Sequence, residues 1–150
     1  MCRVADRRVV LTFDLDLEHR LWLVPEYFPE FADLDYGEYF APEDVADAIG
    51  ADRVEVVPVP HDCQDGFAGA YWRRPERYLD PSVRACISGF ARLDEAVVDR
   101  GIARLAGDLD SGAWHDRHRD LLDKPELDLG YRLVVASGQG DSTRTQLMSG

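Results

Sequence analysis

A chain of 150 residues, with 45% hydrophobic and 31% charged side chains, has the size and composition of one folded globular domain and not those of a disordered chain. Its formal net charge of −12 argues against DNA or RNA as a partner, because these polyanions would be repelled. The chain has no apolar run that could span a membrane, no signal-peptide pattern in residues 1–13, and no framework spacing among its three cysteines. We therefore expect a cytoplasmic protein.

Three β-rich segments predict the strands of a small sheet. Residues 8–13 form a β-branched run that ends at a polar loop, and residues 131–136 form a similar run near the other end of the chain. Residues 54–59 alternate as a strand does, although Pro58 and Pro60 cannot donate ladder hydrogen bonds and indicate a strand end or a sheet edge. Together with helical segments, these runs predict an α/β fold.

Helices are predicted from their start and stop signals and from apolar spacing. The segment 42–50 has proline and acidic residues in its first turn and Gly50 after its last apolar residue. Asp80 and Pro81 predict the start of a helix that runs to about residue 88, and Ser111 is the candidate cap of a later short helix. The predicted helical stretches are a short helix within the aromatic segment 18–40, then 42–50, 67–74, 81–88, 93–109 and 114–122.

The longest predicted helix and the chain end complete the organisation. Apolar residues recur at near-helical spacing through 93–109, so this helix should be amphipathic, and we expect its apolar face to cover the sheet. Gly101 within it costs about 1 kcal/mol relative to alanine. Residues 138–150 are small and polar, and they predict a disordered tail. The expected organisation is a single α/β domain over residues 1–137, followed by that tail.

The order of these elements resembles the C-terminal half of a class I S-adenosylmethionine-dependent methyltransferase. Residues 8–14 look like the fifth strand of that Rossmann-like sheet, residues 54–59 like the sixth and residues 131–136 like the seventh, with the last two strands antiparallel. Residues 60–67, with residues 71–75 close behind, are similar to a subgroup of bacterial members that carry long insertions before the final strand. The resemblance covers nearly the whole of residues 1–137.

The resemblance implies a partial sheet of about three strands and methyl transfer to a small molecule. A small-molecule substrate also agrees with the acidity of the chain. S-adenosylmethionine is the implied cofactor, but no glycine-rich loop follows a first strand and no acidic residue ends a second one. Gly138-Gln139-Gly140 lies in the tail, so it cannot serve as the glycine-rich loop that binds the cofactor. No cofactor-binding residue is therefore assigned.

Candidate catalytic residues follow the second predicted strand, where ligands bind in open α/β sheets. His61 has the right chemistry for a base near neutral pH, and Asp62 or Asp65 is placed to orient it. The alternative is that Asp62 and Asp65 form a capping turn for the next helix while His61 packs at the strand end. Turn chemistry accounts for these residue types without a ligand, so both hypotheses stay open.

Substrate-binding candidates are aromatic and polar residues near the predicted strand ends. Tyr71, Trp72 and Arg73 can clamp an aromatic or carboxylated substrate by stacking and bidentate hydrogen bonds, or they can be a helical turn with its aromatics inward and its arginines in water. The resemblance places Trp22 and Tyr27 in a lid over the substrate, with ordinary core packing as the alternative. Asp14, at the end of the first strand, is a further candidate, with a solvated turn residue as its alternative.

Two rival functions remain. A non-catalytic module can use the uncovered edge of the sheet to pair with a second copy or another chain. A zinc site requires four ligands, and His61, Cys63, His115 and His118 have suitable types, but the two pairs are far apart in the sequence and the spacing is weak. We therefore assign no metal and keep the partner-binding module as the alternative to methyl transfer.

Overall fold

The three predicted strands form one antiparallel sheet with the last strand at its centre. The computed structural model describes residues 7–15, 20–35 and 39–137. Its main sheet has the order β1-β5-β2, with β1 spanning Arg7–Phe13, β2 Arg53–Val56 and β5 Tyr131–Ser137. Because β5 is antiparallel to both neighbours, β1 and β2 run in the same direction. The expected α/β fold, with its last two sheet strands antiparallel, is confirmed.

The register of the sheet follows from its β-branched residues. Val134 of β5 lies between Val10 of β1 and Val54 of β2, and it has no exposed surface. Cross-strand β-branched pairs of this kind pack closely on a pleated surface and stabilise a sheet. Residues Val9, Val56 and Val134 therefore belong to one sheet, as the methyltransferase resemblance requires.

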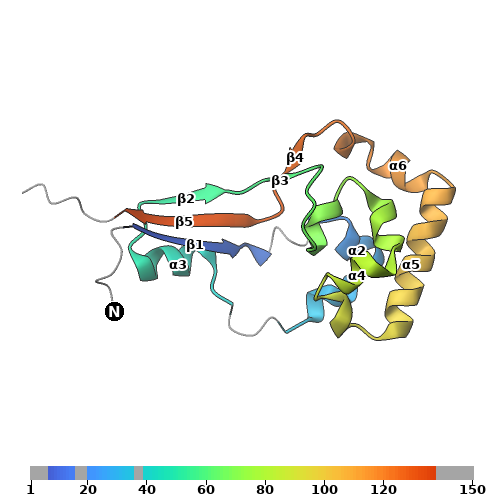
Figure 1. Cartoon of the computed structure of the whole chain (residues 1–150), viewed down its shortest axis with the longest axis horizontal. Coiled ribbons are helices and arrows are strands. Elements are labelled where there is room, and N and C mark those ends of the chain that lie inside the picture. The colour runs from blue at the N-terminus through green and yellow to red at the C-terminus, as the bar shows by residue number, and fades with distance from the viewer. Residues whose placement is uncertain (1–6, 16–19, 36–38, 138–150) are drawn as a thin grey trace, which may run out of the picture.

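One helix covers the sheet, and its termini follow the predicted signals. Helix α3 spans Pro42–Ile49 and packs against all three strands of the sheet. Its first turn has Pro42 and two acidic residues, and Gly50 ends it in the left-handed conformation at φ 60°. Glycine adopts this conformation without the steric cost that a Cβ atom would add. The sheet and α3 form a sheet lobe at one end of the molecule (Figure 1).

Two segments build a second, helical lobe (Figure 1): the one between β1 and α3, and the long connection between β2 and β5. Its elements are α2 (Leu23–Tyr27), η1 (Pro29–Asp33), η2 (Ala68–Tyr71), η3 (Pro75–Leu79), α4 (Pro81–Ala85), η4 (Phe90–Arg92), α5 (Glu95–Asp110), α6 (Ala113–Arg117) and η5 (Arg119–Leu121). Most of its core is aromatic, and Trp72, Trp114, Tyr78 and Phe28 are its largest fully buried side chains. Asp80 caps α4 by accepting a hydrogen bond from Ser82 N, as predicted.

Helix α5 does not cover the sheet, so that prediction was wrong. It packs on α2, η3 and α6 at the far end of the helical lobe (Figure 1). The apolar spacing correctly indicated a buried face, but spacing carries no information about which element covers it. Gly101 is needed there, because a Cβ atom would lie 2.2 Å from Cε1 of the buried Phe28. Ser111 is the residue that follows α5 as its C-cap rather than the cap of α6, which begins after Gly112 at φ 79°.

The second predicted strand divides at its proline. Backbone pairing with β5 ends where Val57 N donates to Tyr131 O, and the chain then leaves the main sheet at Pro58, which has no N–H to donate. Val59–Pro60 forms the short strand β3, which pairs antiparallel with β4, Glu126–Leu127. This two-stranded ladder joins the lobes and was not predicted. The predicted tail, 138–150, lies outside the described residues.

Candidate functional site

A pocket of about 290 Å³ lies at the carboxyl end of β1, between the two lobes. We call it the β1-end pocket. It is lined by Phe13, Val24, Phe31, Gly66, Phe67, Ala68, Cys86, Ile87, Ser88, Gly89 and Tyr131. These residues come from several segments that are distant in sequence. Ligands of open α/β sheets bind beyond the carboxyl ends of strands, so this position is the one expected for a binding site.

Hydrogen bonds at the start of β5 fix one wall of the β1-end pocket. Phe13 pairs with Tyr131 across the sheet, and the next residue, Asp14, donates from its backbone N–H to Gly130 O at 2.8 Å. Gly130 has φ 92°, and its N–H donates to Asp128 Oδ1 at 3.0 Å. The turn is therefore held from both sides, which keeps the Phe13 and Tyr131 rings in place.

Asp128 is also paired with the guanidinium of Arg132 through two hydrogen bonds, at 2.7 and 3.0 Å. This bidentate contact, together with the Gly130 N–H, holds the pKa of the Asp128 carboxyl below its usual value. Asp14 adds to the negative potential around Arg132, whose pKa is raised chiefly by its hydrogen bond to Asp128. The predicted substrate-binding residue Asp14 thus lies next to Phe13 of the pocket wall and near the Asp128–Arg132 ion pair.

Aromatic rings form much of the β1-end pocket. Phe67 packs edge to face on Tyr131, with ring centroids 5.3 Å apart. On the opposite side, Phe31 packs against Phe28 and Phe90 at centroid distances of 5.6 and 5.1 Å. Such contacts hold the rings in fixed orientations and are worth about 0.5–1.5 kcal/mol each beyond the area they bury. The walls are therefore rigid and apolar.

Two glycines set the width of the pocket. A Cβ atom on Gly66 would lie 2.9 Å from Cβ of Cys86, and one on Gly89 would lie 2.9 Å from Cε1 of Phe31. Contacts this short would force the neighbouring residue to move, and both neighbours line the pocket. The backbone at Gly89 is in the ordinary helical region, so its need for glycine comes from space and not from conformation.

The pocket has an apolar floor and a polar rim. Val24, Phe31 and Ile87 are buried, whereas Cys86 and Ser88 are exposed. None of the eleven lining residues is an Asp, Glu, Lys, Arg or His. A charged group would lose hydration there without gaining a charged partner from the lining.

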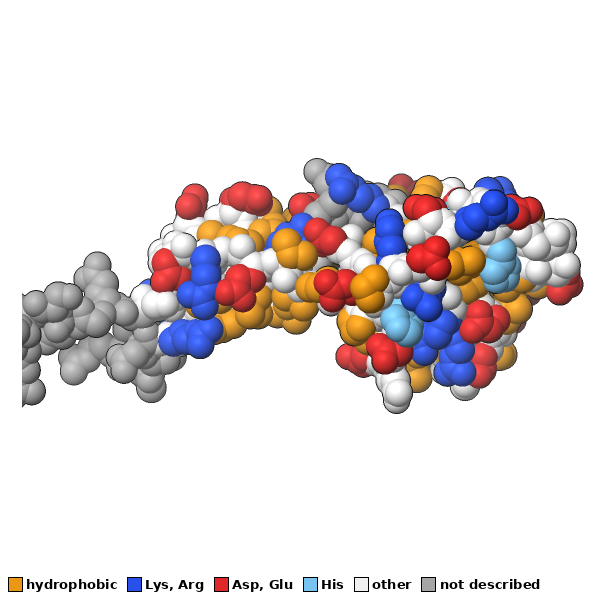
Figure 2. Space-filling view, turned by 90° about the horizontal axis from the view of Figure 1, so that it is seen from above, with side chains coloured by type: hydrophobic (Ala, Val, Ile, Leu, Met, Phe, Trp, Pro, Cys, Tyr) orange, Lys and Arg blue, Asp and Glu red, His pale blue; other side chains and the backbone are white. Residues whose placement is uncertain are grey.

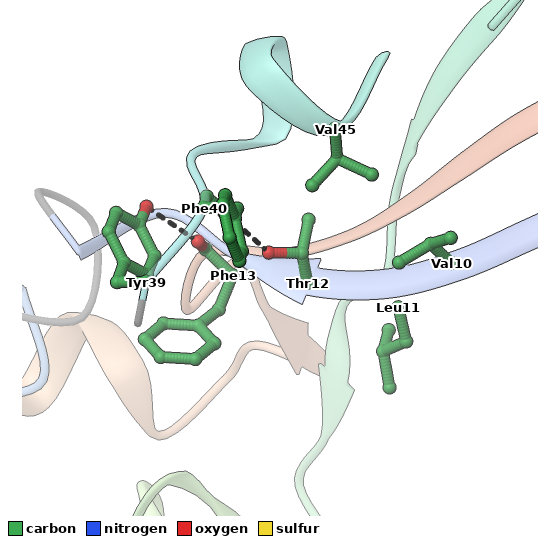
Figure 3. Close-up of a pocket in the computed structure, with 7 residues that line it drawn as sticks. All are labelled: Val10, Leu11, Thr12, Phe13, Tyr39, Phe40 and Val45. Atoms are coloured by element: carbon green, nitrogen blue, oxygen red, sulfur yellow. Dashed lines mark hydrogen bonds between the residues drawn. The ribbon is translucent and has the colours of Figure 1, made fainter. Parts of the chain in front are cut away.

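A second hollow, of about 330 Å³, flanks β1 on the other side of Phe13. It is lined by Val10, Leu11, Thr12, Phe13, Tyr39, Phe40 and Val45 (Figure 3). The Tyr39 hydroxyl donates to Phe13 O at 2.8 Å, and the Thr12 hydroxyl donates to Phe40 O at 3.1 Å. Val45 lies over one side of β1, while Leu11 points to the other side (Figure 3). Residues 39 and 40 therefore contact β1 at its carboxyl end, at Thr12 and Phe13.

The predicted residues Trp22 and Trp72 lie in the core of the helical lobe. Trp22 Nε1 donates to Trp72 O at 2.7 Å, and Trp72 Nε1 donates to Val59 O at 3.0 Å. Trp72 has no exposed surface and Trp22 is 4% exposed. Their polar atoms join the helical lobe to β3, so their burial supports core packing, the alternative considered from the sequence, over a lid or a clamp.

Tyr27 belongs to a polar cluster that joins α2 to α5 and α6. Its hydroxyl donates to Asp108 Oδ2 at 2.7 Å and accepts from Arg117 Nη2 at 2.7 Å. Burial, together with the bond to Asp108, raises the pKa of Tyr27, while the bonds from Tyr27 and Arg117 lower the pKa of Asp108. Arg117 also pairs with Glu26 at 3.2 Å. Tyr27 is thus held in a structural network and does not line the β1-end pocket.

Tyr71 and Arg73 are also engaged in packing. Tyr71 is 6% exposed and lies edge to face on Tyr78, with ring centroids 5.7 Å apart. Arg73 donates from Nη1 to Lys124 O at 2.7 Å, which ties η2 to the segment before β4. Arg74 donates to the carbonyls of Cys63 and Ala70. The structure brings these predicted substrate residues together, but not at the lining of either hollow.

His61 and Asp62 follow β3, as expected. His61 N donates to Pro125 O at 2.9 Å, which continues the β3–β4 pairing, and Asp62 is exposed. Neither residue lines the β1-end pocket or the hollow beside β1. Asp65 accepts a hydrogen bond from Gly66 N at 2.7 Å, but no side chain caps η2, so Asp62 and Asp65 do not form the predicted capping turn. The catalytic role of His61 and Asp62 stays a prediction.

The four candidate zinc ligands do not converge among the described residues. Within residues 7–15, 20–35 and 39–137, no group of three or more His, Cys, Asp or Glu side chains is arranged to hold a metal ion. His118 Nε2 lies 2.9 Å from Glu26 Oε1, and His115 packs edge to face on Trp114. No described helix is both long and apolar enough to cross a bilayer.

Neither the β1-end pocket nor the hollow beside β1 forms a cradle for S-adenosylmethionine. That cofactor has a charged amino-acid end and an adenosine whose ribose hydroxyls call for hydrogen-bonding partners. The β1-end pocket offers no ionised side chain to either end, and the hollow beside β1 is lined by apolar residues with one threonine and one tyrosine. The Gly138-Gln139-Gly140 sequence lies outside the described residues.

The β1-end pocket was not predicted from the sequence. Phe13 and Tyr131 were assigned to strands, Phe31 and Phe67 to a loop or helical turns, and Cys86, Ser88 and Gly89 carry no local motif. The available signal was the switch-point rule applied to Asp14, which did point to the end of β1. The contribution of Gly66 and Gly89 depends on contacts with residues far away in the sequence, so no local pattern could show it.

Comparison with known proteins supports the same fold. No protein-family model and no curated protein matches the chain. A solved structure from Anabaena variabilis ATCC 29413, provisionally described as a methyltransferase from an antibiotic biosynthesis pathway, is 37% identical and superposes with a TM-score of 0.72 over 87% of this chain. The chain spans about half of that structure, 54% of its length. The chain is therefore similar in sequence and fold to this protein, and its small antiparallel sheet with several helices is methyltransferase-like.

Proposed function

We propose that the chain binds the small-molecule methyl acceptor of an S-adenosylmethionine-dependent methyltransferase. The observation that carries this proposal is the position of the β1-end pocket, at the carboxyl end of a strand in a methyltransferase-like fold. Its size is near the lower end of the roughly 300–1,000 Å³ typical of small-molecule sites. The acidity of the chain also disfavours a nucleic acid as the acceptor.

The pocket residues supply binding and orientation. The aromatic walls exclude water from the acceptor, and the rigid packing of Phe31 and Phe67 fixes its position. Positioning alone lowers the barrier of a two-reactant step, because the acceptor no longer has to find the correct orientation in solution. S-adenosylmethionine would supply the methyl group, and no residue of this chain is assigned to hold it. His61 and Asp62 stay candidates for proton removal.

A chimera tests this function. The full chain replaces the matching segment of the Anabaena variabilis protein, and a panel of small hydroxyl and amine compounds is incubated with S-adenosylmethionine. Mass spectrometry then detects products heavier by one CH₂ unit. We expect methylation by the chimera, and its loss when Gly89→Val pushes Phe31 into the pocket. A chimera that folds and binds S-adenosylmethionine but methylates nothing in the panel overturns the proposal. The chain alone is assayed in parallel.

A second candidate function, a partner-binding module, is favoured by exposed apolar residues on the sheet lobe. Val9 and Leu11 of β1 are 47% and 62% exposed, and Val54 and Val56 of β2 are 46% and 52% exposed. Figure 2 shows hydrophobic side chains on both sides of the sheet lobe, seen from the β2 side. Among the described strands, β1 has a partner on one edge alone. An open strand edge beside apolar residues is a template for pairing with another chain.

Light scattering coupled to size-exclusion chromatography separates the two candidates. A mass that doubles with concentration, and that returns to one chain in Leu11→Lys, together with no S-adenosylmethionine binding and no methylation, supports the partner-binding module through a second copy. A mass of one chain at every concentration, with methylation by the chimera, supports the acceptor-binding function.

A further inference from the structure

We propose that the β1-end pocket takes an uncharged acceptor with one or two aromatic rings, whose single polar group lies at the rim. That this ligand is a methyl acceptor rests on the proposed function; that the pocket binds such a ligand does not. Three properties of the pocket lead to it: its rings, its lack of charge and its division into an apolar floor and a polar rim.

The rings favour a flat, unsaturated ligand. Phe13, Phe31, Phe67 and Tyr131 supply four of the eleven lining residues. Their edges and faces are held by contacts with other rings, such as the 5.3 Å pair of Phe67 and Tyr131. An aromatic ligand can add further edge-to-face or offset contacts of the same kind without any rearrangement of the walls. A volume of about 290 Å³ limits the ligand to a small molecule.

The lack of charge disfavours ionised ligands. An anion would enter a pocket with no lining Arg, Lys or His, in a chain whose net charge is −12. A cation would meet ring faces, which attract it, but the aliphatic side chains of Val24, Ala68 and Ile87 cannot replace its water. A neutral ring loses little hydration on entry, so it should bind best.

The rim fixes the orientation. Cys86 and Ser88 are exposed, and their side chains offer a thiol and a hydroxyl that can donate to or accept from one polar group. Val24, Phe31 and Ile87 are buried and offer nothing polar. A phenol-like or aniline-like molecule would therefore place its ring on the floor and its heteroatom at the rim. This is also the end that a methyl donor outside the pocket can reach.

Calorimetry with three matched probes tests the inference on the full chain without S-adenosylmethionine. The probes are 2-naphthol, 2-naphthoate and 2-naphthylmethylamine, which is a cation at neutral pH. We expect 2-naphthol to bind about tenfold more tightly than either charged probe, because its transfer costs less hydration. Tighter binding of the anion or the cation, or no binding of 2-naphthol, overturns the inference.

Variants locate the binding. Ser88→Trp should cover the rim, and Gly89→Val should push the Phe31 ring inward, so each should weaken 2-naphthol binding by about tenfold or more. Gly107→Ala, on the exposed side of α5 with no atom within 4 Å of the added Cβ, is the control and should bind as the wild type does. Ser88 is exposed, so Ser88→Trp serves even if Gly89→Val does not fold. Unchanged binding in Ser88→Trp overturns the inference.

The outcomes separate the binding from the proposed reaction. If 2-naphthol binds and Ser88→Trp weakens that binding, but the chimera methylates nothing, the proposed ligand class is supported and the methyltransferase function is refuted. If the chimera methylates charged acceptors and 2-naphthol does not bind, the proposed function is supported and the proposed ligand class is refuted.

Discussion

Gly101→Ala should destabilise the protein, although alanine is the better helix former. Gly101 lies within α5, and an alanine there would gain about 1 kcal/mol of helix propensity. The added Cβ, however, would lie 2.2, 2.5 and 2.8 Å from three ring atoms of Phe28, which has no exposed surface. Overpacking a close-packed core costs about 1–3 kcal/mol, and three such contacts place this site at the upper end. The net expectation is a loss of about 2 kcal/mol.

Urea unfolding followed by tryptophan fluorescence measures this loss, and a thermal scan should show a fall in Tm of about 6 °C for a domain of this size. Gly107→Ala in the same helix is the matched control, because nothing lies within 4 Å of its added Cβ. It should stabilise the protein by up to about 1 kcal/mol. If Gly101→Ala is as stable as the wild type or more so, the close packing of α5 on Phe28 is wrong.

Three further substitutions test the fold. Trp72→Phe removes the indole donor to Val59 O and should cost about 1–3 kcal/mol in urea unfolding, with a smaller loss or none counting against this link between the helical lobe and β3. Leu105→Ala empties a fully buried position on α5 and should cost about 2–5 kcal/mol, measured in the same way. Because the folded pKa of Asp128 lies below its unfolded value, its pairing with Arg132 stabilises the protein above about pH 4 and is lost as the pH falls through the folded pKa, so Asp128→Asn should flatten the acid limb of a stability-against-pH curve.

The elements that local signals specify were predicted from the sequence. Helix α3 begins at Pro42 and ends before Gly50, and both residues act through their own backbone geometry. The three strands were predicted because β-branched runs favour extended structure whatever their partners are. The class I methyltransferase resemblance predicted that these strands share a sheet, which the pairing of Val10, Val134 and Val54 confirms.

The parts that depend on distant contacts were not predicted. Whether an amphipathic helix covers a sheet or another helix is decided by its partner, and α5 finds that partner in α2, η3 and α6. Trp22 was a candidate for substrate contact from the family resemblance and Trp72 from its residue type, but their indole N–H groups are used inside the core. The β1-end pocket arises where segments far apart in the chain meet, so no single stretch of sequence contains it.

The most direct measurement of the central claim is the catalytic efficiency of the chimera toward a neutral aromatic acceptor, compared between Ser88→Trp and Gly107→Ala. If the β1-end pocket holds the acceptor, Ser88→Trp should lower kcat/KM by about tenfold or more while S-adenosylmethionine binding stays unchanged, and Gly107→Ala should leave both as they were. Equal kcat/KM in Ser88→Trp and Gly107→Ala would contradict the claim that the acceptor binds at the end of β1.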